Sequence, residues 1–443
     1  MSGQTGRSRR RDVTRRDQAP DGAYEEGPNY SRRSAIPFIR LAYLYLRLSG
    51  VDLLNHPALR KWHRWQVEVK QPDGRTMPYD DSRGGFEGYP HALLANPLFK
   101  DATLQRWAHE RAPVVWSLWA AEAMLLFDDR VKAQPPRFRC SRVLPDSGTA
   151  VFRSGWDKDA TMGLLLARPL RPFGADQMNT AHRHDDPLHF LIHSHGQLLA
   201  VDPGYGPSYL ADSRYSWYLT PEAHSMILVD GRGPARSTAF EGDCRRANTS
   251  QSDGRVTEIC RTRDVFGAQA ETSYCGVDFR RSMFFVRKRY FVIVDEVESP
   301  RTHEYAWLLH GGSDDFDYKA DGGVWRVGKA RLTLRLLIPS GMGVKQCVGA
   351  GEGDSKHIYV KAITAGRNVR FVAMIVPDQT GAAKPEVELI SKDPLGLRVR
   401  LDGVKRDDVF VWNPEGKLER LRLPNGRSVR AEKVAKVVAA GGQ

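Results

Sequence analysis

The sequence predicts an α+β protein with a helical region first and a large antiparallel β-sandwich second. Its 443 residues exceed the length of one ordinary domain, which favours two domains. Residues 35–130 carry aromatic and aliphatic side chains at helical spacing, whereas short apolar runs separated by turn residues fill the chain after residue 138. The change follows Pro135 and Pro136, so we expect the domain boundary there.

Four segments of the first region have helical periodicity. Residues 36–50 end at Gly50, a suitable cap, and residues 56–69 have a proline near their start. The other two segments are 101–112 and 112–127. The loop at 71–85 contains Pro-Asp-Gly and Gly-Gly, both of which favour turns. Paired helices with aromatic faces indicate stacked helical hairpins.

The second region contains short runs that alternate between apolar and polar residues. Turn residues separate the runs at strand-length intervals, as in a large antiparallel sandwich. The predicted strands lie within 148–156, 162–169, 188–194, 197–204, 224–233, 281–297, 304–312, 331–341, 369–377, 396–403 and 407–413.

The chain is basic, with 66 Lys and Arg against 53 Asp and Glu and a net charge of +13. This balance favours an acidic partner, and nucleic acid, an anionic membrane and an acidic polysaccharide all fit. Six arginines among the first sixteen residues predict a disordered tail at 1–20. No uncharged apolar stretch is long enough for a transmembrane span. The five cysteines form no C-x-x-C pair, which argues against a disulfide framework and a thiolate zinc site.

Five histidines occur within fourteen positions, in the stretch that begins HRHDD at residue 182. If this stretch is a strand, His182, His184 and Asp186 share one face, because side chains alternate along a strand. Two imidazoles and a carboxylate on one face suit either zinc binding or proton transfer. The other three histidines are out of phase, and we expect them at the surface or in a turn: they are His189, His193 and His195.

The apolar stretch that follows predicts a hairpin that turns near His195 and Gly196. Its return strand ends at Asp202, which therefore comes close to His184 although 18 positions separate the two residues. A third metal ligand is available in His224, at the start of another predicted strand. The H-x-H-x-D string also resembles a motif of metallo-β-lactamase-type hydrolases. Those proteins have another His directly after the Asp, whereas Pro187 follows here, which weighs against a zinc hydrolase.

Taken together, four stretches resemble the heparinase II/III-like polysaccharide lyase family, which is related to oligoalginate lyases. Residues 181–206 match its H-x-H-x-D, apolar strand and D-x-G turn. Residues 215–234 match its Thr…Ala-His-Asn segment, with Ser225 where Asn is usual. In the helical region, residues 20–34 resemble the segment DG-x-x-x-EG-x-x-Y, and residues 72–82 resemble a later loop. The resemblance covers about residues 20–312.

The resemblance implies a partial (α/α) toroid at 21–133 followed by a β-sandwich domain at 139–443. It also implies a lyase that cleaves a uronate-containing acidic polysaccharide by β-elimination. That reaction removes the weakly acidic C5 proton beside a carboxylate and expels the 4-linked sugar. It therefore requires charge neutralisation, a base and an acid. Heparan-type chains, alginate and bacterial exopolysaccharides all stay open as substrates.

The resemblance also assigns roles to residues of this chain. Tyr30 is the toroid tyrosine that acts as base or acid, with Tyr24 as its competitor in the same segment, and His182 faces it. A second catalytic tyrosine is either Tyr215 or Tyr218, of which we expect Tyr218. Weaker candidates for substrate binding are Arg183, Arg214 and Tyr205. Zinc, in a structural or site-shaping role, is implied at His184, Asp202 and His224.

The chain departs from the family pattern at its start, because only about twenty residues precede Asp21. We therefore expect a toroid shortened at its N-terminal side. There are three explanations: a misassigned start or truncated gene, a second chain that supplies the missing helices, and a shortened variant that binds sugar without cleaving it. The family resemblance suggests a periplasmic or cell-envelope location, although the sequence has no signal-peptide stretch. Nucleic-acid binding is not expected, because no recognisable module accompanies the basic tail. A homo-oligomer stays open.

Overall fold

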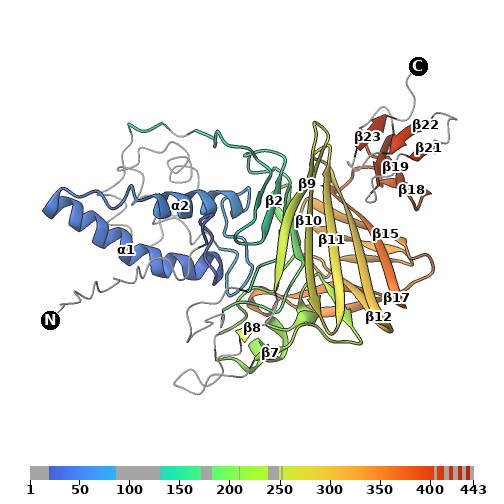
Figure 1. The fold of residues 1–443 in the computed structure, drawn as a ribbon, viewed down its shortest axis with the longest axis horizontal. Helices are drawn as coiled ribbons and strands as arrows, with labels where there is room; N and C mark the ends of the chain where they lie inside the picture. The colour runs from blue at the N-terminus through green and yellow to red at the C-terminus, as the bar shows by residue number, and fades with distance from the viewer. Residues whose placement is uncertain are drawn as a thin grey trace, which may run out of the picture.

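The structure is a computed structural model of the chain. It describes residues 19–85, 130–132, 134–170, 182–208, 210–237, 249–250, 253–403, 407–413, 419–422, 428–431 and 436–439. Most of the predicted tail and the predicted helices at 101–112 and 112–127 lie outside these residues. Within them the protein is mostly antiparallel β-sheet with few helices, and the two α-helices lie to one side of the strands (Figure 1).

Two α-helices precede the sheets. Helix α1 spans Gly27–Ser49 and helix α2 spans Pro57–Val69. Helix α1 ends as predicted at Gly50, whose φ of 73° lies in the left-handed region that glycine adopts easily. It begins nine residues before the predicted start, so Tyr30 lies in its first turns. No helix among the described residues is long and apolar enough to cross a membrane.

The strands form two main sheets and several smaller ones. The five-stranded sheet has the order β1-β2-β3-β4-β5, and its strands are β1 (Arg142–Leu144), β2 (Thr149–Arg153), β3 (Met162–Leu166), β4 (His189–Ser194) and β5 (Gln197–Ala200). The ten-stranded sheet has the order β13-β14-β15-β17-β12-β11-β10-β9, with β16 on β17 and β6 on β12. Its strands are β6 (Ile227–Val229), β9 (Gly254–Arg261), β10 (Val265–Tyr274), β11 (Val277–Val286), β12 (Tyr290–His310), β13 (Phe316–Lys319), β14 (Gly322–Val327), β15 (Ala330–Ile338), β16 (Gly343–Ala350) and β17 (Lys356–Gln379).

The remaining strands lie in a four-stranded sheet of order β18-β19-β20-β23 and in two pairs. They are β7 (Arg236–Ser237), β8 (Thr249–Ser250), β18 (Glu386–Ser391), β19 (Leu395–Arg400), β20 (Asp408–Trp412), β21 (Glu419–Arg422), β22 (Ser428–Ala431) and β23 (Lys436–Ala439). Each of the eleven predicted runs contains at least part of a strand. The strands that the sequence analysis missed include β9 and β16. Most of their residues are exposed or half-buried, so they lack the regular alternation of apolar and polar residues that marked the predicted runs.

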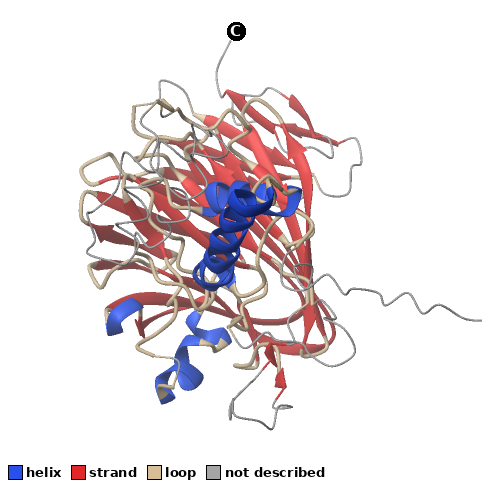
Figure 2. Cartoon of the chain, turned by 90° about the vertical axis from the view of Figure 1, so that its left-hand side faces the viewer, coloured by secondary structure: helices blue, strands red, loops and turns tan. Residues whose placement is uncertain are grey.

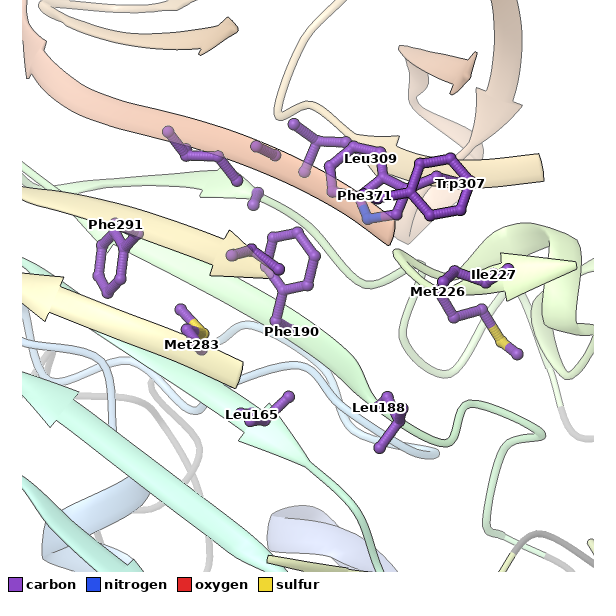
Figure 3. Close-up of a cluster of buried hydrophobic side chains, with 14 of the residues drawn as sticks. Leu165, Leu188, Phe190, Met226, Ile227, Met283, Phe291, Trp307, Leu309 and Phe371 are labelled. Carbon is purple, nitrogen blue, oxygen red and sulfur yellow. The ribbon is translucent and has the colours of Figure 1, made fainter. Parts of the chain in front are cut away.

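The main core fills the space between the five-stranded and ten-stranded sheets. Phe190 of β4 lies near Trp307 of β12, with ring centroids 6.2 Å apart, and Phe152 meets Phe291 edge to face. Figure 3 shows Phe190, Phe291, Trp307 and Phe371 in this cluster. The predicted packing of one antiparallel sheet on another is therefore present in the described residues.

A second core lies on the other face of the five-stranded sheet, where the helices pack. Trp62 and Trp65 of α2 join Val151, Leu164 and Leu166 there. Figure 2 shows the helices in front of the strands. Strands β2, β3 and β4 are therefore buried on both faces, and every residue of each is buried. This double cover decides the environment of the histidines on β4.

Candidate active site and metal centre

The site forms around a loop at residues 80–82, between the helices and the sheets. The Ser82 hydroxyl accepts a hydrogen bond from the Asn29 amide at the start of α1, at 3.1 Å. The Ser82 carbonyl accepts one from the Tyr205 amide at 3.2 Å. The loop thereby joins the first turn of α1 to the turn that follows β5.

Two glycines allow the chain to approach this loop closely. Gly27 has φ 79°, and a Cβ there would lie 2.9 Å from the Asp80 Cβ. Gly204 has φ 66°, and a Cβ there would lie 2.7 Å from the Ser82 carbonyl oxygen. Both glycines belong to the EG and D-x-G motifs read from the sequence, so the motifs serve backbone packing at the site.

Tyr30 and His182 lie face to face, with ring centroids 3.6 Å apart and planes at 23°. The Tyr30 hydroxyl donates a hydrogen bond of 3.3 Å to the Tyr205 hydroxyl. Burial, followed by this hydrogen bond, raises the pKa of Tyr30, so its phenol is protonated at neutral pH. The competing Tyr24 instead bonds its hydroxyl to the Ser34 hydroxyl at 2.7 Å.

Asp81 is buried behind His182 and contacts three nitrogen donors. Its Oδ2 lies 2.7 Å from His182 Nδ1, and its Oδ1 lies 3.2 Å from His184 Nε2. Arg214 also donates to Oδ2. Burial alone would raise the pKa of Asp81, but these hydrogen bonds and charges hold it at about 2. Asp81 is therefore a carboxylate at neutral pH.

A group that could hold a metal ion lies next to this pair. His184, Asp202 and His224 are buried and each offers one ligand atom, with these atoms all within 4.8 Å of one another. His184 Nδ1 and His224 Nε2 have no hydrogen-bond partner although they are buried. His189 Nε2 and His224 Nδ1 each lie 3.2 Å from Asp202 Oδ2. Two imidazoles and a carboxylate are a donor set that suits zinc.

A buried arginine clamp supports the same loop. Arg168 contacts Asp80 and lies 2.6 Å from Asp186 Oδ1, and all three side chains are buried. The Asp80 carboxylate in turn accepts a hydrogen bond from the His184 amide at 3.2 Å. Asp186 therefore pairs with arginine and does not join the metal group, contrary to the shared face that strand spacing predicted.

Two further expectations about the histidine stretch are wrong. Residues 182–186 are not in a strand, because β4 begins only at His189. His189 and His193, expected at the surface, are completely buried, because β4 is covered on both faces. His195 lies in the predicted turn with Gly196, both at positive φ, as a tight hairpin requires. The predicted approach of His184 to Asp202 is confirmed, with Nδ1 and Oδ1 3.9 Å apart.

Three predicted site residues have buried side chains that contact the protein itself. Arg183 is 1 % exposed and donates to the backbone carbonyls of Arg168 and Pro169. Arg214 is also 1 % exposed and contacts Asp81. The Tyr218 hydroxyl donates to the Gly351 carbonyl at 3.0 Å. Their direct roles with a substrate stay predictions, and this geometry does not favour them.

Two arginines that sequence reasoning missed lie beside the tyrosines instead. The Arg33 Cζ lies 5.2 Å from the Tyr30 ring centroid, and the Arg83 Cζ lies 5.2 Å from the Tyr205 centroid. Arg33 is exposed and Arg83 is half-buried. Within the described part of the chain, neither has a carboxylate partner. Arg33 lies three residues after Tyr30 on a helix, a spacing that could have signalled a shared face.

Asp81 was also missed, although the Asp-Asp pair stood within a segment already matched to the family. Its histidine partners are 101 and 103 positions away, beyond the reach of any local pattern.

Comparison with known proteins shows the family to which the chain is similar. The family model described as "Heparinase II/III-like, C-terminal" matches residues 136–370, more than half of the chain. A heparin-sulfate lyase from Pedobacter heparinus is 24% identical over 362 residues, which cover 76% of this chain and 48% of that protein. An exo-oligoalginate lyase from Saccharophagus degradans is 22% identical over 454 residues, which cover 90% of this chain and 57% of that protein.

Solved structures agree on the fold. A heparan sulfate lyase mutant from Pedobacter heparinus matches with a TM-score of 0.69 at 17% identity, over 96% of this chain and 60% of that one. A structure described as a heparinase III gene product matches with a TM-score of 0.66 at 19% identity, over 88% of this chain and 59% of that one. The chain spans about half the length of the curated relatives it matches.

Proposed function

The chain belongs to the heparinase II/III-like family, and on that basis we propose that it is a lyase that cleaves a uronate-containing acidic polysaccharide by β-elimination. The relatives are named as lyases of heparin sulfate and of alginate oligosaccharides. The observation that carries the proposal is the stacked Tyr30–His182 pair, which brings two proton-transfer groups together at one point. The net charge of +13 suits an acidic polymer.

The reaction requires two proton transfers, one from C5 to a base and one from an acid to the leaving oxygen on C4. A base takes the proton from C5, and the electron pair of that C–H bond forms the C4–C5 double bond. The C4–O bond breaks at the same time, and its oxygen takes a proton from an acid. A positive group beside the carboxylate stabilises the negative charge that develops there.

His182 suits the base and Tyr30 suits the acid. His182 bonds Asp81 through Nδ1, which leaves Nε2 to accept the C5 proton. Tyr30 keeps its phenol proton at neutral pH because burial raises its pKa, so it can donate to the leaving oxygen. The Tyr205 hydroxyl accepts from Tyr30 and supports its orientation.

Arg33 and Arg83 are the groups we assign to the substrate carboxylate. Both guanidinium groups lie over the rings of the site tyrosines. They stay accessible to solvent, whereas the side chains of Arg183 and Arg214 are buried. A guanidinium matches the planar fork of a carboxylate and also binds sulfate, so both sulfated and unsulfated uronates fit.

Zinc is the ion we assign to the buried group of His184, Asp202 and His224. The two buried imidazole nitrogens without partners and the nearby carboxylate fit its preference for nitrogen and oxygen ligands. When bound, the ion would fix the positions of these three side chains from different segments and so hold the site in shape.

The test is the appearance of unsaturated product. Purified protein is incubated with heparan sulfate or oligoalginate, and the ultraviolet absorbance of the 4,5-unsaturated uronate is followed. Tyr30→Phe and His182→Ala are each expected to lower kcat by roughly 100- to 10,000-fold, because each removes a proton-transfer group. Tyr24→Phe, which removes a hydroxyl from the same segment, is the matched control and should retain the wild-type rate.

Two outcomes would contradict the proposal. Full activity in both site variants would exclude the assigned roles. Saturable binding of these acidic polysaccharides, measured by calorimetry, with no unsaturated product from any of them would favour a protein that binds without cleaving.

A further inference from the structure

We propose that Asp81 is a positioning residue that fixes the tautomer of His182 and couples it to His184 of the metal group. The inference rests on the proposed function for its effect on catalysis, but its structural part holds for the resting protein. Asp81 comes from the loop at 80–82 on the helical side, whereas both histidines come from the segment before β4.

The two oxygens of Asp81 face different histidines. Oδ2 lies 2.7 Å from His182 Nδ1, and Oδ1 lies 3.2 Å from His184 Nε2. The Asp81 amide also donates to the His182 carbonyl at 3.1 Å, so the backbone of the loop and that of the histidine segment are joined at the same point. Arg214 contacts Oδ2 and balances the carboxylate charge.

This arrangement sets the proton positions on both rings. A carboxylate only accepts hydrogen bonds, so the nitrogen that faces it on each histidine carries the hydrogen. His182 is then the Nδ1–H tautomer, with the lone pair on Nε2. His184 is the Nε2–H tautomer, with the lone pair on Nδ1.

On each ring the nitrogen that does not face Asp81 carries the lone pair. His182 Nε2 lies 3.9 Å from Glu26 Oε1, beyond hydrogen-bond distance, on the ring that stacks on Tyr30. His184 Nδ1 lies 3.9 Å from Asp202 Oδ1 and has no hydrogen-bond partner, as expected for a nitrogen that faces a cation. Hydrogen bonds to one carboxylate thus fix the position of the lone pair on both rings.

Asp81 therefore joins the metal group to the proton-transfer pair. His184 would be oriented by a bound cation, and Asp81, which contacts both histidines, would then help to fix the orientation of His182. Carboxylates that accept from a ligating histidine are known to raise metal affinity by fixing the ring and its tautomer. Here the same carboxylate supports a second histidine, so loss of Asp81 should impair both sites.

The chain offers a matched control in Asp73. Its carboxylate is also mostly buried, lies 3.9 Å from His193 Nε2 and pairs with Arg75 at 2.5 Å. It therefore repeats the carboxylate, histidine and arginine combination of Asp81. Among the described residues, its side-chain contacts are with Arg75 and His193, and not with Tyr30 or the metal group. If Asp81 had a purely structural role, Asp81→Asn and Asp73→Asn would have similar effects.

The first experiment reads the tautomer in the wild-type protein and uses a variant only to assign signals. Full-length protein labelled with ¹⁵N on histidine is examined by NMR, and the His182 signals are assigned by comparison with His182→Gln. The Nδ1–H tautomer is expected for His182 in the wild type. An Nε2–H tautomer there would overturn the proposal.

The second experiment compares Asp81→Asn with Asp73→Asn. An asparagine side chain has one acceptor and one donor end, so it cannot accept from both histidines at once, and one ring must change its tautomer or lose the bond. We expect kcat to fall on the order of 100- to 10,000-fold with KM nearly unchanged, as for other carboxylates behind a catalytic histidine. Zinc affinity, measured by chelator competition, should fall about 10- to 100-fold. Asp73→Asn should change neither quantity.

The outcomes separate this inference from the proposed function. Equal losses in both variants, or wild-type kcat and zinc affinity in Asp81→Asn, would overturn the positioning role. An inactive wild type in which His182 is the Nδ1–H tautomer and zinc affinity depends on Asp81 would refute only the lyase proposal.

Discussion

Arg83→Gln tests whether the solvent-accessible arginines of the site bind the substrate carboxylate. Arg83 donates through Nη2 to the carbonyls of Pro207 and Gly206, at 3.3 and 3.4 Å. Both distances are at the long end of the hydrogen-bond range, so the guanidinium keeps donors for a ligand. The guanidinium lies over the ring of Tyr205, whose hydroxyl accepts the hydrogen bond from Tyr30.

The size of the effect follows from the chemistry of that contact. A hydrogen bond to a charged group contributes about 1.5–3 kcal/mol. At about 1.4 kcal/mol for each factor of ten, its loss should lower kcat/KM by roughly 10- to 150-fold. Because Arg83 is half-buried, salt should screen the contact only in part, and the difference from the wild type should persist at moderate ionic strength.

The assay is the initial rate of unsaturated-uronate formation over a range of substrate concentrations. Arg261→Gln is the matched control, since this guanidinium also lies over an aromatic ring, at 4.5 Å from the Phe266 centroid, on the sandwich. It should keep the wild-type kcat/KM. A change of less than twofold in Arg83→Gln would refute the assignment of this arginine to the substrate.

Two further predictions concern stability. Arg168→Met leaves the buried carboxylates of Asp80 and Asp186 without their shared cation and should cost about 3–5 kcal/mol, and a cost below about 1 kcal/mol in denaturant unfolding would contradict the clamp. Burial would raise the pKa of Asp73, but its pairing with His193 and Arg75 lowers it from 3.8 to about 2, so its contribution is present above pH 4 and is lost as the pH falls towards 2. The stability difference between wild type and Asp73→Asn should therefore shrink across that window, and a constant difference in acid unfolding curves would show that the carboxylate is not responsible.

The sequence by itself determined the elements whose side chains follow a local pattern. The apolar runs predicted four strands of the five-stranded sheet, β2 to β5, and five strands of the ten-stranded sheet, which are β6, β11, β12, β15 and β17. Gly50 predicted the end of α1, because strand and helix periods depend only on neighbouring residues. The predicted hairpin turn at His195 and Gly196 also led to the correct prediction that His184 lies near Asp202, because a tight turn reverses the chain within a few residues.

Only the tertiary structure decided which polar groups meet across the boundary of helices and sheets. His189 and His193 are buried because the helices cover the second face of the five-stranded sheet, a contact that no alternation along β4 records. Arg183 is buried because its guanidinium donates to the backbone carbonyls of Arg168 and Pro169, contacts that the spacing of the histidine motif does not predict. Asp81 gains its histidines only after more than a hundred residues of intervening chain have folded, so its role depends on packing and not on spacing.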